Sequence, residues 1–173
     1  VFETVVERTS YRLMSVRGGD VELAVDVGHV FSYRAQNSSA GKASLGVVGS
    51  ATQKAQGVSE FQKHLDPFAT SMFAHELGHQ LNATHTFNGI LGNCDQRNAA
   101  TSYEPGGGTS IMAYAGVCGP QLTQPNDNIK NTNDPFFHGG SIKQIVEFVA
   151  GLPDGVGSNL DVANKAPMVE AGS

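Results

Sequence analysis

Apolar residues recur with a period of two in the N-terminal third of the chain. Between positions 21 and 27 they alternate with charged or small residues, which predicts a half-buried strand over 21–27. The short apolar, glycine-containing run Leu45–Gly49 predicts a second strand, and the polar residues 37–42 before it predict a loop. Residues 1–20 fit a strand and a helix equally well.

A helix is predicted from residue 67 onward. Asp66 offers an N-cap carboxylate, and Pro67 suits the first helical position. Apolar residues then recur at every fourth position and give the helix one apolar face: Phe73, Leu77 and Leu81. The helix is expected to end near Asn82, because asparagine tolerates a left-handed backbone.

A second helix is predicted near the C-terminal end of the chain. Ser141 and Gln144 have the spacing of a capping box, and Gly151 is expected to end the helix. Four apolar residues between them follow helical spacing: Ile142, Ile145, Val146 and Val149. Residues 152–173 are polar and contain proline and glycine, as linkers do, so one domain is predicted over residues 1–151.

The region between the predicted helices, residues 84–138, has little periodicity and many glycine, asparagine and proline residues. An irregular stretch of this length inside a compact domain is usually functional or unstable. The Asp- and Asn-rich part of it, Asn126 to Asp134, offers oxygen ligands for calcium, although its spacing is not that of an EF-hand. We therefore expect a solvated loop there.

Composition narrows the classes of partner. The chain has 173 residues and a formal net charge of -5, with no basic stripe, so nucleic acid is not an expected partner. No apolar run is long enough to cross a bilayer, so membrane insertion is not expected either. Cys94 and Cys118 would pair in an exported protein and would be two unrelated thiols in a cytosolic one.

The segment HELGHQLNATH carries the candidate chemistry. On a helix, His75 and His79 lie one turn apart on the same face, so their ring nitrogens can bind one zinc ion. Glu76 lies beside that face and can accept a proton from water at the metal. If the helix ends before His85, the chain can turn back and present a third nitrogen.

Three histidine ligands leave a fourth position open for water, as catalytic zinc sites do. Structural zinc sites normally use cysteines in short paired spacings, which this chain does not have. The alternative is that the HExxH match is a coincidence and that its two histidines lie on a solvated helix face. A third histidine six residues further on argues against that alternative.

These motifs resemble a known family. HELGHQLNATH resembles the zinc signature of the metzincin peptidases, HExxHxxGxxH, with Asn82 where that pattern has glycine, and SIMAYAG at residues 110–116 resembles their Met-turn. Within the metzincins, the chain is similar to the bacterial reprolysin-like, adamalysin-related group. The runs that carry this likeness, within residues 21–151, are VDVGHVFS at 25–32, HELGHQLNATHTFNG at 75–89, TSYEPGGGTSIMAYAGVCG at 101–119 and DPFFH at 134–138.

The resemblance implies an α+β fold of the metzincin type. We expect a small twisted mixed sheet packed on helices, an active-site helix, a Met-turn and an irregular lower subdomain with a C-terminal helix. Metzincin domains generally open with a longer strand–helix–strand segment, so the N-terminal part is expected to be shortened here. The resemblance also favours a disulfide between Cys94 and Cys118, which would contribute roughly 3 kcal/mol by loop-entropy models.

The resemblance further implies a secreted bacterial zinc endopeptidase that acts as a monomer on an extended peptide. By that likeness Met112 is the methionine beneath the metal, although an ordinary core methionine is the simpler reading of the residue alone. Tyr114 matches a tyrosine that approaches the metal in astacin- and serralysin-like metzincins and is kept as a candidate catalytic residue. A core tyrosine that only supports the turn is the alternative that we favour for it.

The substrate is expected to add a strand to a sheet edge near Leu45–Gly49. Its specificity pocket is expected around Ala115 to Gly119, with a contribution from the helix Ile142–Val149. Two other function classes remain open: a metzincin-fold binding module that does not cleave, and a zinc hydrolase of a non-peptide bond. The histidines outside the motif are expected to be ordinary surface or core residues: His29, His64 and His138.

Overall fold

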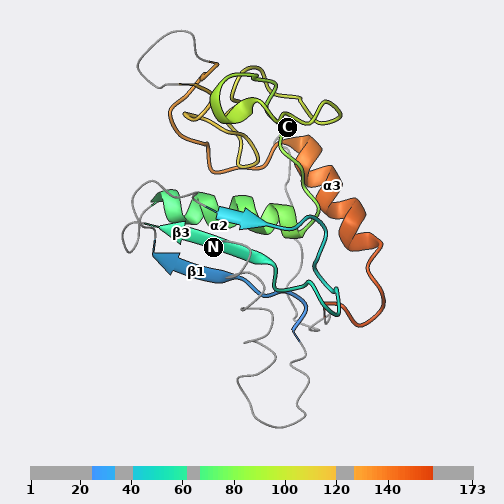
Figure 1. Cartoon of the computed structure of the whole chain (residues 1–173). Helices are drawn as coiled ribbons and strands as arrows, with labels where there is room; N and C mark the ends of the chain where they lie inside the picture. The colour runs from blue at the N-terminus through green and yellow to red at the C-terminus, as the bar shows by residue number, and fades with distance from the viewer. Residues whose placement is uncertain (1–24, 34–40, 62–66, 120–126, 158–173) are drawn as a thin grey trace, which may run out of the picture.

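A three-stranded sheet with a helix on one face forms the first half of the fold (Figure 1). The computed structural model describes residues 25–33, 41–61, 67–119 and 127–157. The strands are β1 (Val30–Tyr33), β2 (Gly41–Ala43) and β3 (Gly57–Phe61), and the helices are α2 (Pro67–Gln80), the 3₁₀ helix η1 (Gly92–Cys94) and α3 (Gly139–Ala150). The small mixed sheet and the helices confirm the expected α+β fold class within these residues.

The sheet is mixed, with the strand order β1-β3-β2. Strand β1 runs parallel to β3, with Val30 opposite Val58, and β2 runs antiparallel to β3, with Gly41 opposite Ser59. Val58 and Ser59, in the central strand, are 1% and 0% exposed. Helix α2 packs against this sheet, and the irregular part of the chain lies on the opposite side of α2 (Figure 1).

The second predicted strand was wrong, and the first is absent from the part of it that the structure describes. Residues 25–29 have no strand structure, and β1 begins at Val30 instead; residues 21–24 of that prediction lie outside the described part of the chain. Strand β2 forms at Gly41–Ala43, which includes the end of the predicted loop 37–42. The apolar run Leu45–Gly49 is not a strand but two turns, with positive φ at Gly46 and Gly49.

The run Leu45–Gly49 instead closes the C-terminal end of α2. The N–H groups of Gly46 and Val47 donate to the carbonyls of His79 and Gln80, each at 3.0 Å, and Val48 N–H donates to Gln80 at 3.3 Å. The last carbonyls of a helix have no partner within the helix, so these bonds supply the donors that water would otherwise have to provide. A tertiary contact therefore determines the conformation of this run.

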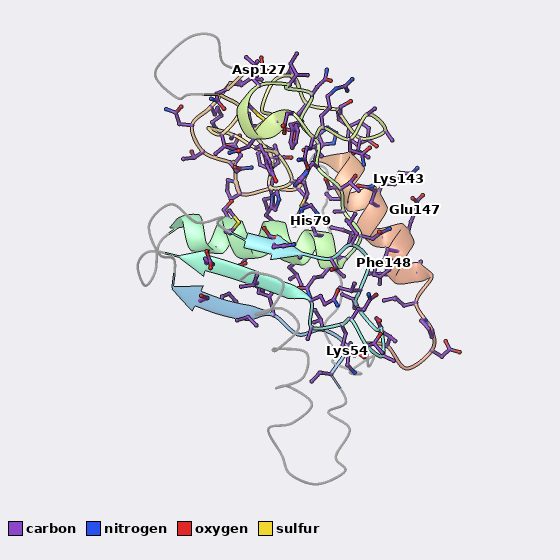
Figure 2. All side chains as sticks on the ribbon, in the orientation of Figure 1. Lys54, His79, Asp127, Lys143, Glu147 and Phe148 are labelled. Carbon is purple, nitrogen blue, oxygen red and sulfur yellow. A yellow bond between two sulfur atoms is a disulfide. The ribbon has the colours of Figure 1, made fainter. Side chains whose placement is uncertain are left out.

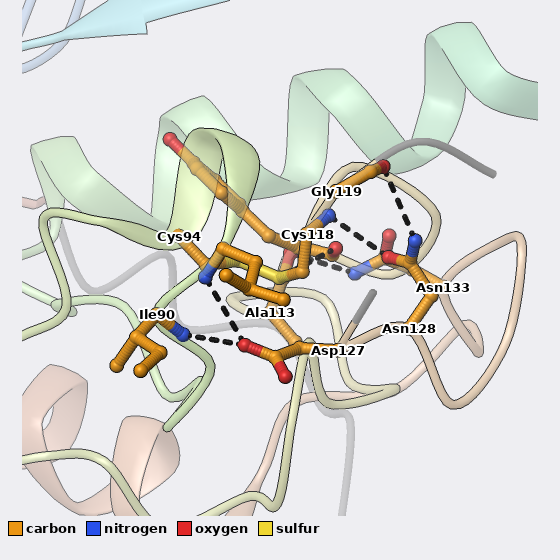
Figure 3. Close-up of a disulfide and its surroundings, with 10 residues drawn as sticks. Ile90, Cys94, Ala113, Cys118, Gly119, Asp127, Asn128 and Asn133 are labelled. Carbon is orange, nitrogen blue, oxygen red and sulfur yellow. Dashed lines mark hydrogen bonds between the residues drawn. A yellow bond between two sulfur atoms is a disulfide. The ribbon is translucent and has the colours of Figure 1, made fainter. Parts of the chain in front are cut away.

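The irregular part of the chain, residues 84–119 and 127–138 as described, is held by individual hydrogen bonds and a cross-link and not by long elements. Asp127 accepts the N–H groups of Ile90 and Leu91 through Oδ2, at 2.7 and 3.1 Å (Figure 3). The predicted disulfide is present between Cys94 and Cys118, both fully buried against Phe87. A covalent cross-link and side chain–backbone bonds thus replace periodic structure here.

Helix α3 begins three residues earlier than predicted. Its N-cap is His138, whose Nδ1 accepts the Gly140 N–H at 3.0 Å, so Ser141 and Gln144 do not form a capping box. Gln144 instead bonds Thr84 through the backbone N–H and the hydroxyl. The C-cap is Gly151, as predicted.

The apolar face predicted for this helix is only partly used. Ile145 packs on the core formed by Ala83, Ile111 and Met112. Three other apolar side chains are about half exposed: Ile142, Val146 and Val149. Within the described residues, no helix has the length and apolar character that a bilayer crossing requires.

Candidate metal centre

Helix α2 presents two imidazoles and one carboxylate of the HELGH motif. The helix begins at Pro67, which fits the predicted first helical position, whereas Asp66 lies outside the described residues. His75 and Glu76 are buried, at 6% and 5% exposed. Figure 2 labels His79 on α2, where the helix meets the irregular part of the chain. The site therefore lies between the two halves of the fold.

A Schellman turn ends α2, as the sequence predicted near residue 82. Asn82 has φ 71°, its N–H donates to His79 O at 2.8 Å, and the Ala83 N–H donates to Gly78 O at 2.8 Å. This turn also brings the Ala83 carbonyl back to the His79 side chain, which donates to it from Nδ1 at 2.8 Å. The turn that ends the helix therefore also orients a candidate ligand.

The turn delivers His85 to the other two histidines. Its Nε2 lies 3.3 Å from Nε2 of His75 and 3.1 Å from Nε2 of His79. The candidate ligand atoms of the three residues all lie within 4.8 Å of one another, and within the described residues they form the group suited to a metal ion. The structure thus brings together all three predicted ligands.

The donor set fits a divalent cation. A carbonyl can only accept, so the Nδ1 atoms of His75 and His79 carry the protons that bond Ile111 O, at 2.7 Å, and Ala83 O. Their Nε2 lone pairs are then free to face one common point, as metal-binding histidines require. Burial lowers the pKa of all three rings. The charges of His79 and His85 lower that of His75 further, and the charge of His79 adds to the lowering at His85, whose pKa falls to about 3. All three rings are therefore neutral near pH 7, the form that binds metal.

Glu76 lies at the edge of the sheet as well as beside the histidines. A Cβ atom built on Gly41, in β2, would come within 2.4 Å of Glu76 Oε1, so the carboxyl group rests on the backbone of that strand. Burial raises the pKa of Glu76 to about 8. A cation on the three histidines would act in the opposite direction, because it stabilises the charged carboxylate.

Met112 packs against α2 from the turn that follows Ser110. It is fully buried, and its Sδ would be 2.5 Å from a Cβ at Gly78 of α2. The absence of a side chain at Gly78 therefore lets the methionine pack directly against the helix backbone between His75 and His79. The carbonyl of the preceding residue, Ile111, is the one that accepts from His75.

Tyr114 packs against the site. Its ring lies 4.4 Å from that of His85 and is stacked on Phe87 at 4.6 Å. Burial, followed by the charge of Glu76, raises the pKa of Tyr114 to about 12. The tyrosine thus packs on His85 and Phe87 and shares its surroundings with Glu76.

Sequence reasoning did not single out Gln80, which is fully buried and adjoins His79. Its Nε2 donates to Gly28 O at 2.9 Å, which leaves Oε1 to accept from His29 Nδ1 at 2.8 Å. His29 Nε2 is then the acceptor for the Ser59 hydroxyl at 2.9 Å. The half-buried His29 thus links α2 to the start of β1 and to β3. His138 caps α3, and His64 lies outside the described residues.

The sequence reasoning also missed Glu104. It is 8% exposed and accepts hydrogen bonds from Thr86, which follows His85, and from Ser110, which precedes Ile111. A signal was available, since Glu104 is the one Asp, Glu, Lys or Arg in the sequence between Arg97 and Asp127. An isolated charge in a long uncharged stretch is a candidate for a buried, hydrogen-bonded group.

The Asp- and Asn-rich loop uses its described side chains within the protein. Asp127 binds two backbone N–H groups, Asn128 Oδ1 accepts the Cys118 N–H at 2.8 Å, and Asn133 donates to Ala113 O at 3.0 Å. Asp134 forms an ion pair with Lys130. These bonds give the loop a structural role, and Asn126 lies outside the described residues.

The fold and the site together have the arrangement expected of a metzincin-type candidate metal centre: two histidines on a helix, a third after the turn that ends it, and a buried methionine packed on that helix. The sequence model of the metallo-peptidase family M12B, reprolysin-like, matches residues 6–146. The chain belongs to this reprolysin-like family, which confirms the resemblance seen in its motifs. A comparison with curated proteins finds no match.

Proposed function

We propose that the chain is a zinc-dependent endopeptidase whose metal is held by His75, His79 and His85. The observation that carries the proposal is the convergence of three neutral imidazole nitrogens, two of them with their protons fixed on backbone carbonyls. When bound, zinc supplies Lewis acidity that activates water and polarises the scissile carbonyl. Membership of a metallopeptidase family makes a peptide the substrate that fits best.

Glu76 is the general base in this proposal. Its carboxylate takes a proton from the attacking water and returns it to the leaving amine. The close approach of Gly41 holds that carboxylate against the edge strand, beside the path of an extended peptide. Substrate is therefore expected along β2, Gly41–Ala43, and not along Leu45–Gly49 as the sequence suggested.

Tyr114 is a second candidate for the chemistry. Its raised pKa keeps the hydroxyl protonated across the physiological range, so Oη can donate a hydrogen bond to an oxygen that gains negative charge. Its ring contacts with His85 and Phe87 would hold the group in place. The specificity pocket near Ala115 to Gly119 and α3 remains a prediction.

Two features bear on the setting of the enzyme. The disulfide is compatible with an extracellular protein, because such bonds persist in oxidising compartments. We therefore extend the proposal to a secreted enzyme whose catalytic domain lies within residues 1–151, with residues 152–173 as a linker. A monomer is expected, since the site is assembled within one chain.

The test compares Glu76→Gln with wild type and with Glu147→Gln, which removes an exposed carboxylate on α3. Each protein is incubated with a peptide mixture, with and without a chelator, and its zinc content is measured. Wild type and Glu147→Gln should cleave internal bonds unless chelated, whereas Glu76→Gln should bind one zinc and cleave nothing. Wild type that binds zinc but cleaves no peptide would be a binding module or would act on another bond. Full activity in Glu76→Gln would remove its assignment as the base.

A further inference from the structure

A buried carboxylate outside the zinc signature connects the segment that follows one candidate ligand, His85, with the segment whose Ile111 carbonyl accepts from another, His75. Glu104 Oε1 accepts the N–H groups of Thr109 and Ser110, at 2.8 and 3.0 Å. Its Oε2 accepts the hydroxyls of Thr86 and Ser110. Each oxygen therefore has two donors, and the carboxylate is fully used by the protein.

Each segment that donates to Glu104 adjoins a residue that takes part in the metal centre, either as a candidate ligand or as the partner of one. Thr86 follows His85 directly, and its N–H donates to Met112 O at 3.1 Å. Ser110 precedes Ile111, whose carbonyl accepts from His75 Nδ1 at 2.7 Å. A shift of the carboxylate would thus move the backbone at His85 and the group that orients His75.

The Met-turn is held from its other side by an amide. Asn133 donates from Nδ2 to the carbonyls of Ser110 and Ala113. Glu104 binds N–H groups of this turn and Asn133 binds its carbonyls, so the turn is clamped between two side chains of opposite hydrogen-bonding character. Ile111 O keeps its direction toward α2 as a result.

The charge of Glu104 is balanced by these donors. Among the residues that the structure describes, no lysine or arginine forms an ion pair with it. Burial acts to raise the pKa of Glu104, but hydrogen bonds from Ser110, Thr86 and the backbone of Thr109 hold it below its ordinary value. A carboxylate that accepts several N–H and O–H bonds is a rigid anchor, because each donor stabilises the charged form.

We propose that Glu104 is a positioning residue for the metal centre, which sets the directions of His75 and His85 by anchoring Thr86 and Ser110. This inference rests on the metal site of the proposed function, but it concerns metal binding and not cleavage. Outer contacts of this kind typically change metal affinity by about 10–100-fold when they are removed.

The test measures zinc affinity and the visible spectrum of the Co²⁺ form for Glu104→Ala, Glu104→Gln and Asp127→Ala. Asp127 is a matched control, since its carboxylate also holds two backbone N–H groups of the irregular half, at Ile90 and Leu91. Glu104→Gln keeps one carbonyl oxygen for the two N–H groups, and the Thr86 and Ser110 hydroxyls can reverse to accept from its amide. Affinities are compared only at temperatures where circular dichroism shows each zinc-free protein folded.

We expect Glu104→Ala to raise the zinc dissociation constant by about tenfold or more and to change the Co²⁺ spectrum. Glu104→Gln should recover most of that loss, and Asp127→Ala should keep wild-type affinity even if it unfolds at a lower temperature. Wild-type affinity in folded Glu104→Ala, or an equal loss in Asp127→Ala, would overturn the proposal. If Glu104→Ala does not fold, Glu104→Gln becomes the test. An unaltered Co²⁺ spectrum and zinc affinity in Glu104→Gln support the anchor, whereas loss of both contradicts the predicted rescue. Wild type that binds zinc in this way but cleaves no peptide would reject only the proposed function.

Discussion

Gly41 in the edge strand and Glu76 in α2 are in such close contact that no side chain fits between them. A Cβ at residue 41 would lie 2.4 Å from Glu76 Oε1, 2.7 Å from its Cγ and 2.8 Å from its Cδ. The carboxyl group must rotate away if any other residue replaces this glycine. The position of the proposed base therefore depends on a residue that is remote from it in sequence.

Replacing Gly41 by alanine should lower kcat with little change in zinc content. A displacement of a catalytic group by about 1 Å can cost on the order of 100-fold, so a loss of that size is expected. Steady-state peptide hydrolysis and metal analysis of Gly41→Ala measure the two effects. Gly139→Ala serves as the control, because a Cβ at Gly139 meets no atom within 4 Å. Normal kcat in Gly41→Ala would show that the observed carboxyl position is not needed for catalysis.

Asn82 should be replaceable by glycine but not by alanine. Its backbone has φ 71°, where an L-residue other than glycine or asparagine is strained by about 1–2 kcal/mol. We expect Asn82→Ala to lower the free energy of unfolding by about 1 kcal/mol and to weaken zinc binding, because the turn also directs Ala83 O to His79. Asn82→Gly should match wild type in both. Urea denaturation and zinc titration of the pair measure the difference, and equal behaviour of the two variants would contradict it.

The half-buried His29, hydrogen-bonded to the buried Gln80, should make stability depend on pH. Burial lowers the pKa of His29, and the Gln80 hydrogen bond opposes that shift only in part. Because the folded-state pKa lies below the unfolded value of about 6.5, the unfolded chain binds more protons in this range. The free energy of unfolding is therefore unaffected by His29 above the unfolded pKa of about 6.5. It falls as the pH drops below that value toward and through the lowered folded-state pKa.

His29→Asn removes this titration while its amide can still donate to Gln80. The free energy of unfolding, measured by urea between pH 7.5 and pH 5, should fall less in the variant than in wild type. The three metal-site histidines titrate in both proteins, so the difference between the two curves isolates His29. Parallel curves would rule out this contribution.

The disulfide should stabilise the irregular half more than the sheet. Cys94 and Cys118 are 24 residues apart in sequence. The cross-link lowers the conformational entropy of the unfolded chain and so adds about 3 kcal/mol to the free energy of unfolding. The double variant Cys94→Ser, Cys118→Ser should lose stability on that scale, and reduction of wild type should have the same effect. Denaturation curves measure both losses. Stability equal to that of oxidised wild type would show that the packing of Phe87 and Tyr114 suffices without the bond.

Local chemistry explains which parts of the fold were predictable. Pro67, Asn82 and Gly151 act through their own backbones, so the helix boundaries near them could be read from the sequence. The strands could not, because Leu45–Gly49 takes its conformation from bonds to the end of α2. An apolar run alone does not show whether it will pair with a strand or cover a helix.

The same distinction applies to the site. The three histidines lie within eleven consecutive residues. His75 and His79 are one helical turn apart and His85 follows a residue that can end the helix, so their convergence was predictable. Glu104 acts through Thr86 and Ser110, which are 18 and 6 residues away from it in sequence. Its role depends on how the irregular half folds, and no periodicity in that half indicates the fold.

The division of the ligands between two structural units has a consequence for folding. His75 and His79 belong to the helix on the sheet, whereas His85 opens the irregular half, so an ion held by all three acts as a reversible cross-link between them. Binding that requires the folded state adds stability in proportion to the logarithm of free ligand. We therefore expect amide hydrogen exchange to quicken on zinc depletion in residues 84–119 and 127–138 before it does in α2. The cooperativity of the domain would then be set by the zinc concentration of its surroundings.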